Sequence, residues 1–187
     1  MPNYGANETV WRQEPALSSK GDSQASEPER ERVRVCAQLV DHLGDQLYFS
    51  SGASADKGQE VRLAGDESKP SFLRDMTPTM RRIGDVGVPH TIYYLVELLD
   101  FLRPVDPEAV FDLIAHALLQ GGARHGYQFE SLATDRFAEI VGVYLADHRA
   151  IFTDPARREK LIGCLDIFVE AGWPKARRLL YRLPELL

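Results

Sequence analysis

Cysteine is nearly absent from this 187-residue sequence, which contains only Cys36 and Cys164. The two lie far apart in the chain, and neither has a second cysteine or a histidine cluster beside it. This spacing argues against a disulfide framework and against a zinc site of the Cys/His type. Both cysteines fall on apolar helix faces, so we expect each to be a small residue of the core.

Long apolar runs are missing as well. No stretch approaches the roughly 18 to 20 apolar residues that a membrane-spanning helix needs. The N-terminus has neither the basic start nor the apolar centre of a signal peptide. With 44% apolar and 27% charged residues, the composition is that of a soluble globular protein. We therefore expect no membrane partner and a cytoplasmic location.

Sequence motifs of catalysis are also missing. The chain contains no G-x-x-x-x-G-K-[ST], G-x-G-x-x-G, H-E-x-x-H, C-x-x-C or G-x-S-x-G pattern. The nearest glycine-rich segment, 121–126, follows a predicted helix instead of a strand, and Gly121 is interpreted as the residue that ends that helix. Arg124 and His125 remain candidates for contact with an anionic partner. We predict no catalytic residue, no cofactor or cofactor-binding residue, and no metal ligand, and hence a protein that is not an enzyme.

Histidine spacing gives only weak signals. Asp112 and His116 are four residues apart on one predicted helix, as are Tyr144 and His148. Such pairs usually make hydrogen bonds along a helix surface. The alternative is a small metal-dependent enzyme that uses His116, His125 or His148.

Two acidic residues occur in the most apolar segment of the chain. Glu97 and Asp100 are three residues apart in a predicted helix that begins at Pro89. They are compatible with a buried pair of acids, but we predict that they lie on the outward edge of that helix.

What the sequence does contain is helical periodicity, which predicts an all-α fold. We expect a disordered tail over 1–27, where Ser, Gly, Gln and Glu dominate. An amphipathic helix over 28–49 follows, then a linker over 50–69 and an α-helical, repeat-like domain over 70–187. The apolar face expected for the first helix consists of Val33, Cys36, Leu39, Val40, Leu43 and Leu47.

Proline and glycine mark the helix boundaries in the second half. Asp106-Pro107 and Asp154-Pro155 each combine an N-cap with a first-turn proline, and Gly172 is followed by Pro174. One long helix is expected from about Phe129 to Ile151-Phe152. The short connections predict antiparallel helical hairpins, arranged either as a HEAT- or TPR-like helical repeat or as an irregular bundle.

Charge is unevenly distributed along the chain, whose net charge is −6. Residues 89–147 contain three basic and nine acidic residues, whereas residues 148–187 contain eight basic and five acidic ones. Such an asymmetric module is able to guide the docking of a charged partner or of a neighbouring domain. The candidate partner-binding residues near the C-terminus are Trp173, Lys175, Arg177, Arg178 and Arg182.

The last two predicted helices and their short turn superficially match a DNA-binding helix-turn-helix. The second helix is apolar and short, and it offers no Asn, Gln or Ser for reading bases. A terminal helical hairpin with Trp173 packed into the joint is favoured. The basic C-terminal helix nevertheless leaves nucleic-acid binding as an alternative function.

Three segments, 126–133, 144–149 and 171–178, resemble the C-terminal helical regions of large bacterial NACHT/STAND-like proteins, which are often described as ATP-binding. The resemblance covers about residues 89–187. It implies the helical scaffold of a multidomain NTPase-type protein whose nucleotide site lies elsewhere. This chain contains no nucleotide motif, so the resemblance does not imply ATP binding here.

Together these features predict a non-enzymatic α-helical scaffold or protein-interaction module. Its partner would be another protein or an adjacent domain of a larger system. An exposed apolar end of a helical stack would also favour self-association.

Overall fold

The computed structural model describes residues 27–53, 68–125 and 131–186, and every regular element within these ranges is helical. The predicted all-α class is therefore confirmed. The tail expected over 1–27 lies outside the described residues except for Glu27. Of the linker expected over 50–69, residues 54–67 lie outside them, whereas Ser50 and Ser51 belong to the first helix and Ser68 and Lys69 to the second. The elements are α1 (Glu27–Ser51), α2 (Ser68–Val86), α3 (Pro89–Leu102), α4 (Pro107–His125), α5 (Ser131–Asp147), the 3-10 helix η3 (Arg149–Thr153), α6 (Pro155–Glu170) and α7 (Pro174–Leu186).

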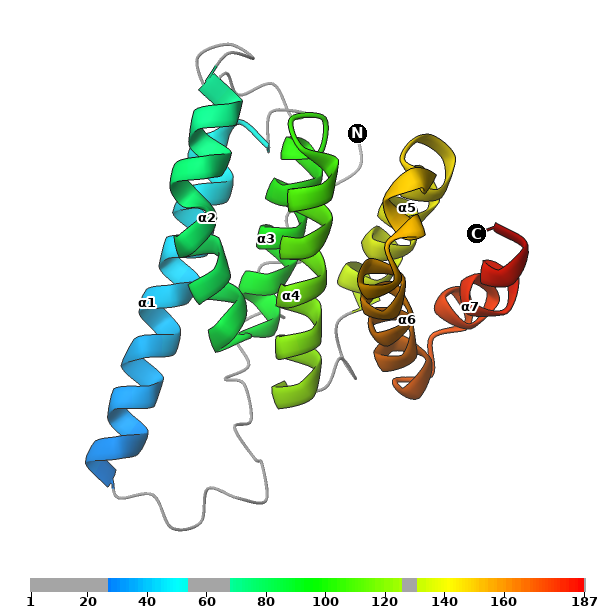
Figure 1. The fold of residues 1–187 in the computed structure, drawn as a ribbon. Coiled ribbons are helices and arrows are strands. Elements are labelled where there is room, and N and C mark those ends of the chain that lie inside the picture. Colours follow the sequence, from blue (N-terminus) through cyan, green and yellow to red (C-terminus); the bar gives the residue numbers. More distant parts are fainter. Residues whose placement is uncertain (1–26, 54–67, 126–130, 187) are drawn as a thin grey trace, which may run out of the picture.

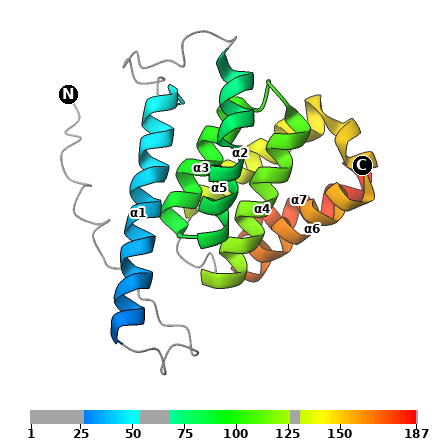
Figure 2. The ribbon, with the colours of Figure 1, turned by 60° about the vertical axis from the view of Figure 1, so that its left-hand side comes forward.

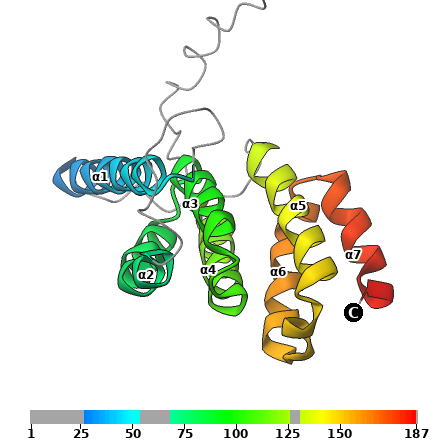
Figure 3. The ribbon, with the colours of Figure 1, turned by 90° about the horizontal axis from the view of Figure 1, so that it is seen from above.

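The helices form two rows (Figures 1 and 3). Helices α1, α3, α5 and α7 make one row, and α2, α4 and α6 make the other. Each helix packs against the helix two places further along the chain, from α1 on α3 to α5 on α7. Consecutive helices such as α3 and α4, or α6 and α7, also pack against each other across short connections. The stack is thus built from antiparallel hairpins.

Helix α3 occupies the centre of the stack because it is apolar nearly all round. It packs against α1, α2, α4 and α5. A helix with several neighbours needs apolar residues on more than one face, and α3 supplies them. Its buried core residues are Ile92, Leu95, Val96, Leu98, Leu99 and Leu102.

Two of the predicted helix starts have the hydrogen bonds expected of an N-cap. Asp106 accepts a hydrogen bond from the backbone N–H of Ala109 at 3.0 Å, and Asp154 accepts one from the backbone N–H of Ala156, also at 3.0 Å. In both cases the aspartate is the N-cap and the next residue is a proline. These carboxylates satisfy backbone donors that the first helical turn leaves unpaired.

The turn between α6 and α7 is a Schellman motif. Gly172 has a φ of +88°, a conformation that residues with a Cβ adopt only at a cost. The Trp173 N–H donates to the Phe168 carbonyl and the Gly172 N–H donates to the Val169 carbonyl, each at 2.9 Å. This pair of bonds ends α6 and turns the chain directly into α7.

Other predicted boundaries were wrong. Helix α4 runs through Gly121 and ends at His125, so Gly121 is not a helix cap. The long helix expected up to Phe152 is divided, because α5 ends at Asp147 and the buried pair Ile151-Phe152 lies in η3.

Helix α1 packs against the other described helices along only part of its length. Its N-terminal half extends beyond the other helices (Figures 1 and 2). The side of α1 that faces α3 carries Gly44, which is buried, whereas Val33, Leu39 and Leu43 are 57%, 64% and 41% exposed. Cys36 is exposed too, so its prediction as a core residue was wrong, while Cys164 is buried as predicted.

Candidate functional site

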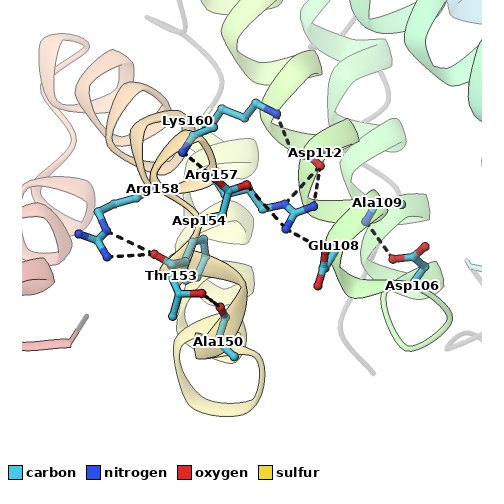
Figure 4. Close-up of polar contacts among 12 residues, drawn as sticks. Asp106, Glu108, Ala109, Asp112, Ala150, Thr153, Asp154, Arg157, Arg158 and Lys160 are labelled. Atoms are coloured by element: carbon cyan, nitrogen blue, oxygen red, sulfur yellow. Dashed lines mark hydrogen bonds and ion pairs between the residues drawn. The ribbon is translucent and has the colours of Figure 1, made fainter.

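A cluster of ion pairs joins α4 to α6 (Figure 4). The Arg157 guanidinium lies 2.8 Å from the Glu108 carboxylate and 3.3 Å from Asp112. Lys160, one turn further along α6, contacts the second oxygen of Asp112 at 2.6 Å. Two cations of α6 are thereby neutralised by two acids of α4.

A cavity of about 290 Å³ lies beside this cluster. Arg157 and Asp112 form one side of it, and Thr77 and Arg81 of α2 form another. Both charged residues of α4 that line it, Glu108 and Asp112, are already engaged by Arg157. The cluster therefore connects α4 to α6, because its acidic and basic side chains are paired with one another.

A second network joins α3 to α5. Arg136 lies 2.9 Å from Glu97, 2.7 Å from Asp100 and 3.2 Å from Glu139. Asp100 is also held by Arg103 at 2.9 Å. Glu97 and Asp100 are half-buried between the helices, so the prediction that they lie on an outward edge was wrong. Burial raises the pKa of Glu97 even though Arg136 opposes the shift.

The cluster between α4 and α6 accounts for part of the charge asymmetry in the sequence. Glu108 and Asp112 belong to the acidic segment 89–147, and their partners Arg157 and Lys160 belong to the basic segment 148–187. Arg158 is also engaged, because it donates to the Phe152 carbonyl. Part of the asymmetry therefore holds α6 against α4. The basic residues of α7 are a different case.

Helix α7 presents an exposed row of cations. Lys175, Arg178 and Arg182 are exposed and recur at intervals of three and four residues, which places them on one side of the helix. Within the described part of the chain, Arg178 and Arg182 make no ion pair. We refer to Lys175, Arg178 and Arg182 as the α7 basic stripe. Arg177 is exposed on another side, where it lies over the Tyr181 ring, 6.0 Å from its centre.

A shallow groove runs beside the basic stripe. It is lined by Ala138 and Glu139 of α5 and by Lys175, Arg178 and Leu179 of α7, and its volume is about 290 Å³. The stripe thus borders a partly apolar surface on which a side chain of a partner is able to rest.

The other predicted contact residues have different positions. Trp173 packs against the core at the start of α7, as the predicted hairpin requires, so it supports the basic helix from below. Arg124 and His125 belong to the last turn of α4, and their side chains lie outside the described part of the structure. The structure therefore places Lys175, Arg178 and Arg182 together on one side of α7 and Arg177 on another, with Trp173 packed against the core at the start of the helix.

Of the two histidine pairs suggested by their spacing, Tyr144 with His148 is in contact, whereas His116 has a different partner from Asp112. His116 Nε2 lies 2.9 Å from Asp85 at the end of α2, not against Asp112. His148 contacts the Tyr144 ring, whose hydroxyl donates to the Pro107 carbonyl. Burial raises the pKa of Cys164 to about 12, which keeps that thiol protonated and unreactive.

Sequence analysis missed one polar cluster, at the crossing of α1 and α3. Asp41 accepts hydrogen bonds from the Thr91 hydroxyl at 2.7 Å and is 3.0 Å from His90 Nδ1. The hydrogen bond with His90 lowers the pKa of Asp41. These residues are 49 and 50 positions apart in the chain, so no local spacing signals that they meet. Only the knowledge that α1 packs on α3 would reveal it.

Comparison with known proteins identified no relative of this chain. No family model, no curated protein and no solved structure matches the chain. Among the described helices, none combines the length and apolar character that crossing a membrane requires.

Proposed function

We propose that this chain is a non-enzymatic helical protein-interaction module and that the α7 basic stripe binds an acidic segment of a partner protein. The observation that carries the proposal is the exposure of Lys175, Arg178 and Arg182 beside a groove, on a chain whose net charge is −6. The two-row order of the helices is the order found in helical-repeat scaffolds, which use extended surfaces for binding.

The spacing of the stripe suits a segment with periodic acidic residues. Lys175 and Arg182 are seven residues apart, or about 10 Å along a helix axis. Glutamates or aspartates on two successive turns of a partner helix match this span. An apolar side chain of the partner would then rest on Leu179 and Ala138 in the groove.

A protein partner fits this surface better than a nucleic acid does. The stripe consists of three cations, and Glu139 lines the groove beside it. A duplex carries a phosphate charge about every 1.7 Å, so it would extend past this short stripe over a protein that is acidic as a whole. An acidic peptide needs no more length than α7 offers.

Fluorescence anisotropy with a labelled glutamate-rich peptide tests the proposal. We expect saturable binding that weakens with added salt. Reversing two charges in Arg178→Glu/Arg182→Glu should weaken it at least about tenfold, because like charges then face each other. The matched control is Arg74→Glu/Arg81→Glu, which changes the net charge equally at exposed positions of α2.

Equal loss in both double variants would show non-specific attraction and would contradict a site on α7. Single-stranded and double-stranded oligonucleotides are titrated in parallel. Tighter binding of an oligonucleotide than of the peptide, with the same dependence on Arg178 and Arg182, would replace the protein partner with a nucleic acid.

A further inference from the structure

The crossing of α1 and α3 brings three metal-ligating side chains together. Asp41 and Asp45 lie one turn apart on α1, and His90 lies in the first turn of α3. One ligand atom from each of the three lies within 4.8 Å of the other two. The set consists of two carboxylates and an imidazole from two separate helices, brought together by tertiary packing.

Asp45 is the unusual member of the group. Its Oδ1 atom is buried from solvent, and no donor in the described part of the structure hydrogen-bonds to it. Buried carboxylate oxygens nearly always have a partner, because leaving one without a partner costs the full desolvation of the group. Asp41 stands in the opposite situation, since it interacts with both His90 and Thr91. The cluster therefore contains one buried carboxylate oxygen to which no described group donates a hydrogen bond.

The backbone holds the three side chains in place. Gly44 lies between Asp41 and Asp45 in sequence and faces Thr91 so closely that a Cβ there would be 2.5 Å from Thr91 Cγ2. This close approach sets the distance between α1 and α3 at the cluster. The Thr91 hydroxyl also orients the Asp41 carboxylate, as outer-shell donors do for metal ligands.

We propose that Asp41, Asp45 and His90 bind one divalent transition-metal ion of the Zn²⁺ or Mn²⁺ class, which joins α1 to α3. Two carboxylate oxygens and one imidazole nitrogen suit these ions, whereas Mg²⁺ and Ca²⁺ prefer oxygen alone. The 3.0 Å between Asp41 Oδ1 and His90 Nδ1 is short enough for both atoms to contact one ion at about 2.0–2.2 Å. The His90 and Asp41 side chains are 46% and 37% exposed, so the ion has access from solvent and water is able to complete its coordination.

The ion would stabilise the packing of α1 against α3. That helix packs against the rest of the molecule through its C-terminal half, and the cluster lies within the contact. A cation held by both helices binds the docked arrangement and not the separated one, so it favours docking by mass action.

The test uses the full chain, stripped of metal with a chelator and titrated with Zn²⁺ by calorimetry and with Co²⁺ by visible absorption. We expect one ion per chain. Asp45→Asn, which keeps the size of the side chain, and His90→Ala should each weaken binding at least about tenfold. The control is His42→Ala, which removes an exposed imidazole next to Asp41 in sequence but outside the cluster.

Hydrogen exchange provides a readout that does not depend on the variants. In the unmodified chain, Zn²⁺ should slow the exchange of α1 amides more than that of α6 amides. Three results would overturn the proposal: no saturable binding, binding that survives both Asp45→Asn and His90→Ala, or an equal loss in His42→Ala.

Discussion

At the scale of single residues, two glycines in similar open surroundings have opposite roles. A Cβ added at Gly172 or at Gly142 would meet no atom within 4 Å, so neither position is limited by space. Gly172 has a positive φ in the turn after α6, whereas Gly142 lies within α5. The backbone conformation alone therefore separates them.

We expect Gly172→Ala to lower the free energy of unfolding by about 1 kcal/mol, because alanine is strained at positive φ. Gly142→Ala should raise it by about 0.5–1 kcal/mol through helix propensity. Urea unfolding of both variants checks the pair. Equal effects of the same sign would contradict the Schellman turn at Gly172.

The effect of losing Arg136 on stability should depend on pH. In Arg136→Met, the half-buried carboxylates Glu97 and Asp100 lose a shared cation, and we expect a loss of about 1–3 kcal/mol at pH 7. Burial raises the pKa of Glu97 above its value in the unfolded chain. The contribution of Glu97 to folding stability is therefore fully present at a pH below its unfolded pKa, and it is lost as the pH rises through its folded pKa. Without Arg136 that pKa rises further.

The destabilisation by Arg136→Met should therefore shrink between pH 7 and pH 4, as Glu97 takes up a proton. Chemical unfolding at both pH values measures it. Arg74→Met is the control, because Arg74 is exposed and, among the described residues, pairs only with its exposed neighbour Asp75. A change below about 0.5 kcal/mol is expected for this variant. A loss that does not vary with pH would show that packing of the Arg136 stem, and not its charge, is what matters.

At the scale of elements, the closeness of α1 and α3 is the feature most open to test. Gly44→Ala gains about 1 kcal/mol of helix propensity but places a methyl group against Thr91, an overpacking that costs about 1–3 kcal/mol. Thr91 is buried and β-branched, so it has little freedom to move aside. We expect a net loss of about 1 kcal/mol and faster amide exchange in α1.

Thr91→Ser supplies the matched rescue. It removes the methyl group that Gly44→Ala would meet and keeps the hydroxyl that donates to Asp41. The double variant Gly44→Ala/Thr91→Ser should regain most of the lost stability. If Gly44→Ala were as stabilising as Gly142→Ala, the close contact between α1 and α3 would be refuted.

At the scale of the whole molecule, the sequence predicts local structure well and partners between helices poorly. The sequences Asp106-Pro107 and Asp154-Pro155 correctly predict helix starts, because an N-cap bonds to residues only two or three positions further along the chain. The apolar periodicity of α1 indicated a buried face, but Leu39 and Leu43 are exposed, since periodicity does not reveal how much of a helix its neighbours cover. The likeness to NACHT/STAND-like C-terminal regions remains a prediction.

The candidate sites also differ in how far the sequence predicts them. The cations of α7 were predictable, because Lys175, Arg178 and Arg182 follow one another on a single helix. The sequence could not show that Arg157 and Lys160 are paired with acids, because this depends on which residues of α4 lie opposite α6. The cluster of Asp41, Asp45 and His90 was equally hidden, because its members come from helices separated by α2.

The two-row order also has a consequence for how the chain is made. Every substantial contact between described helices joins elements that are at most two helices apart along the chain. During synthesis from the N-terminus, α1 needs only α3 to emerge from the ribosome, and α4 needs only α6. Each helix is therefore able to find its partner in the stack once the helix two places further along has been translated.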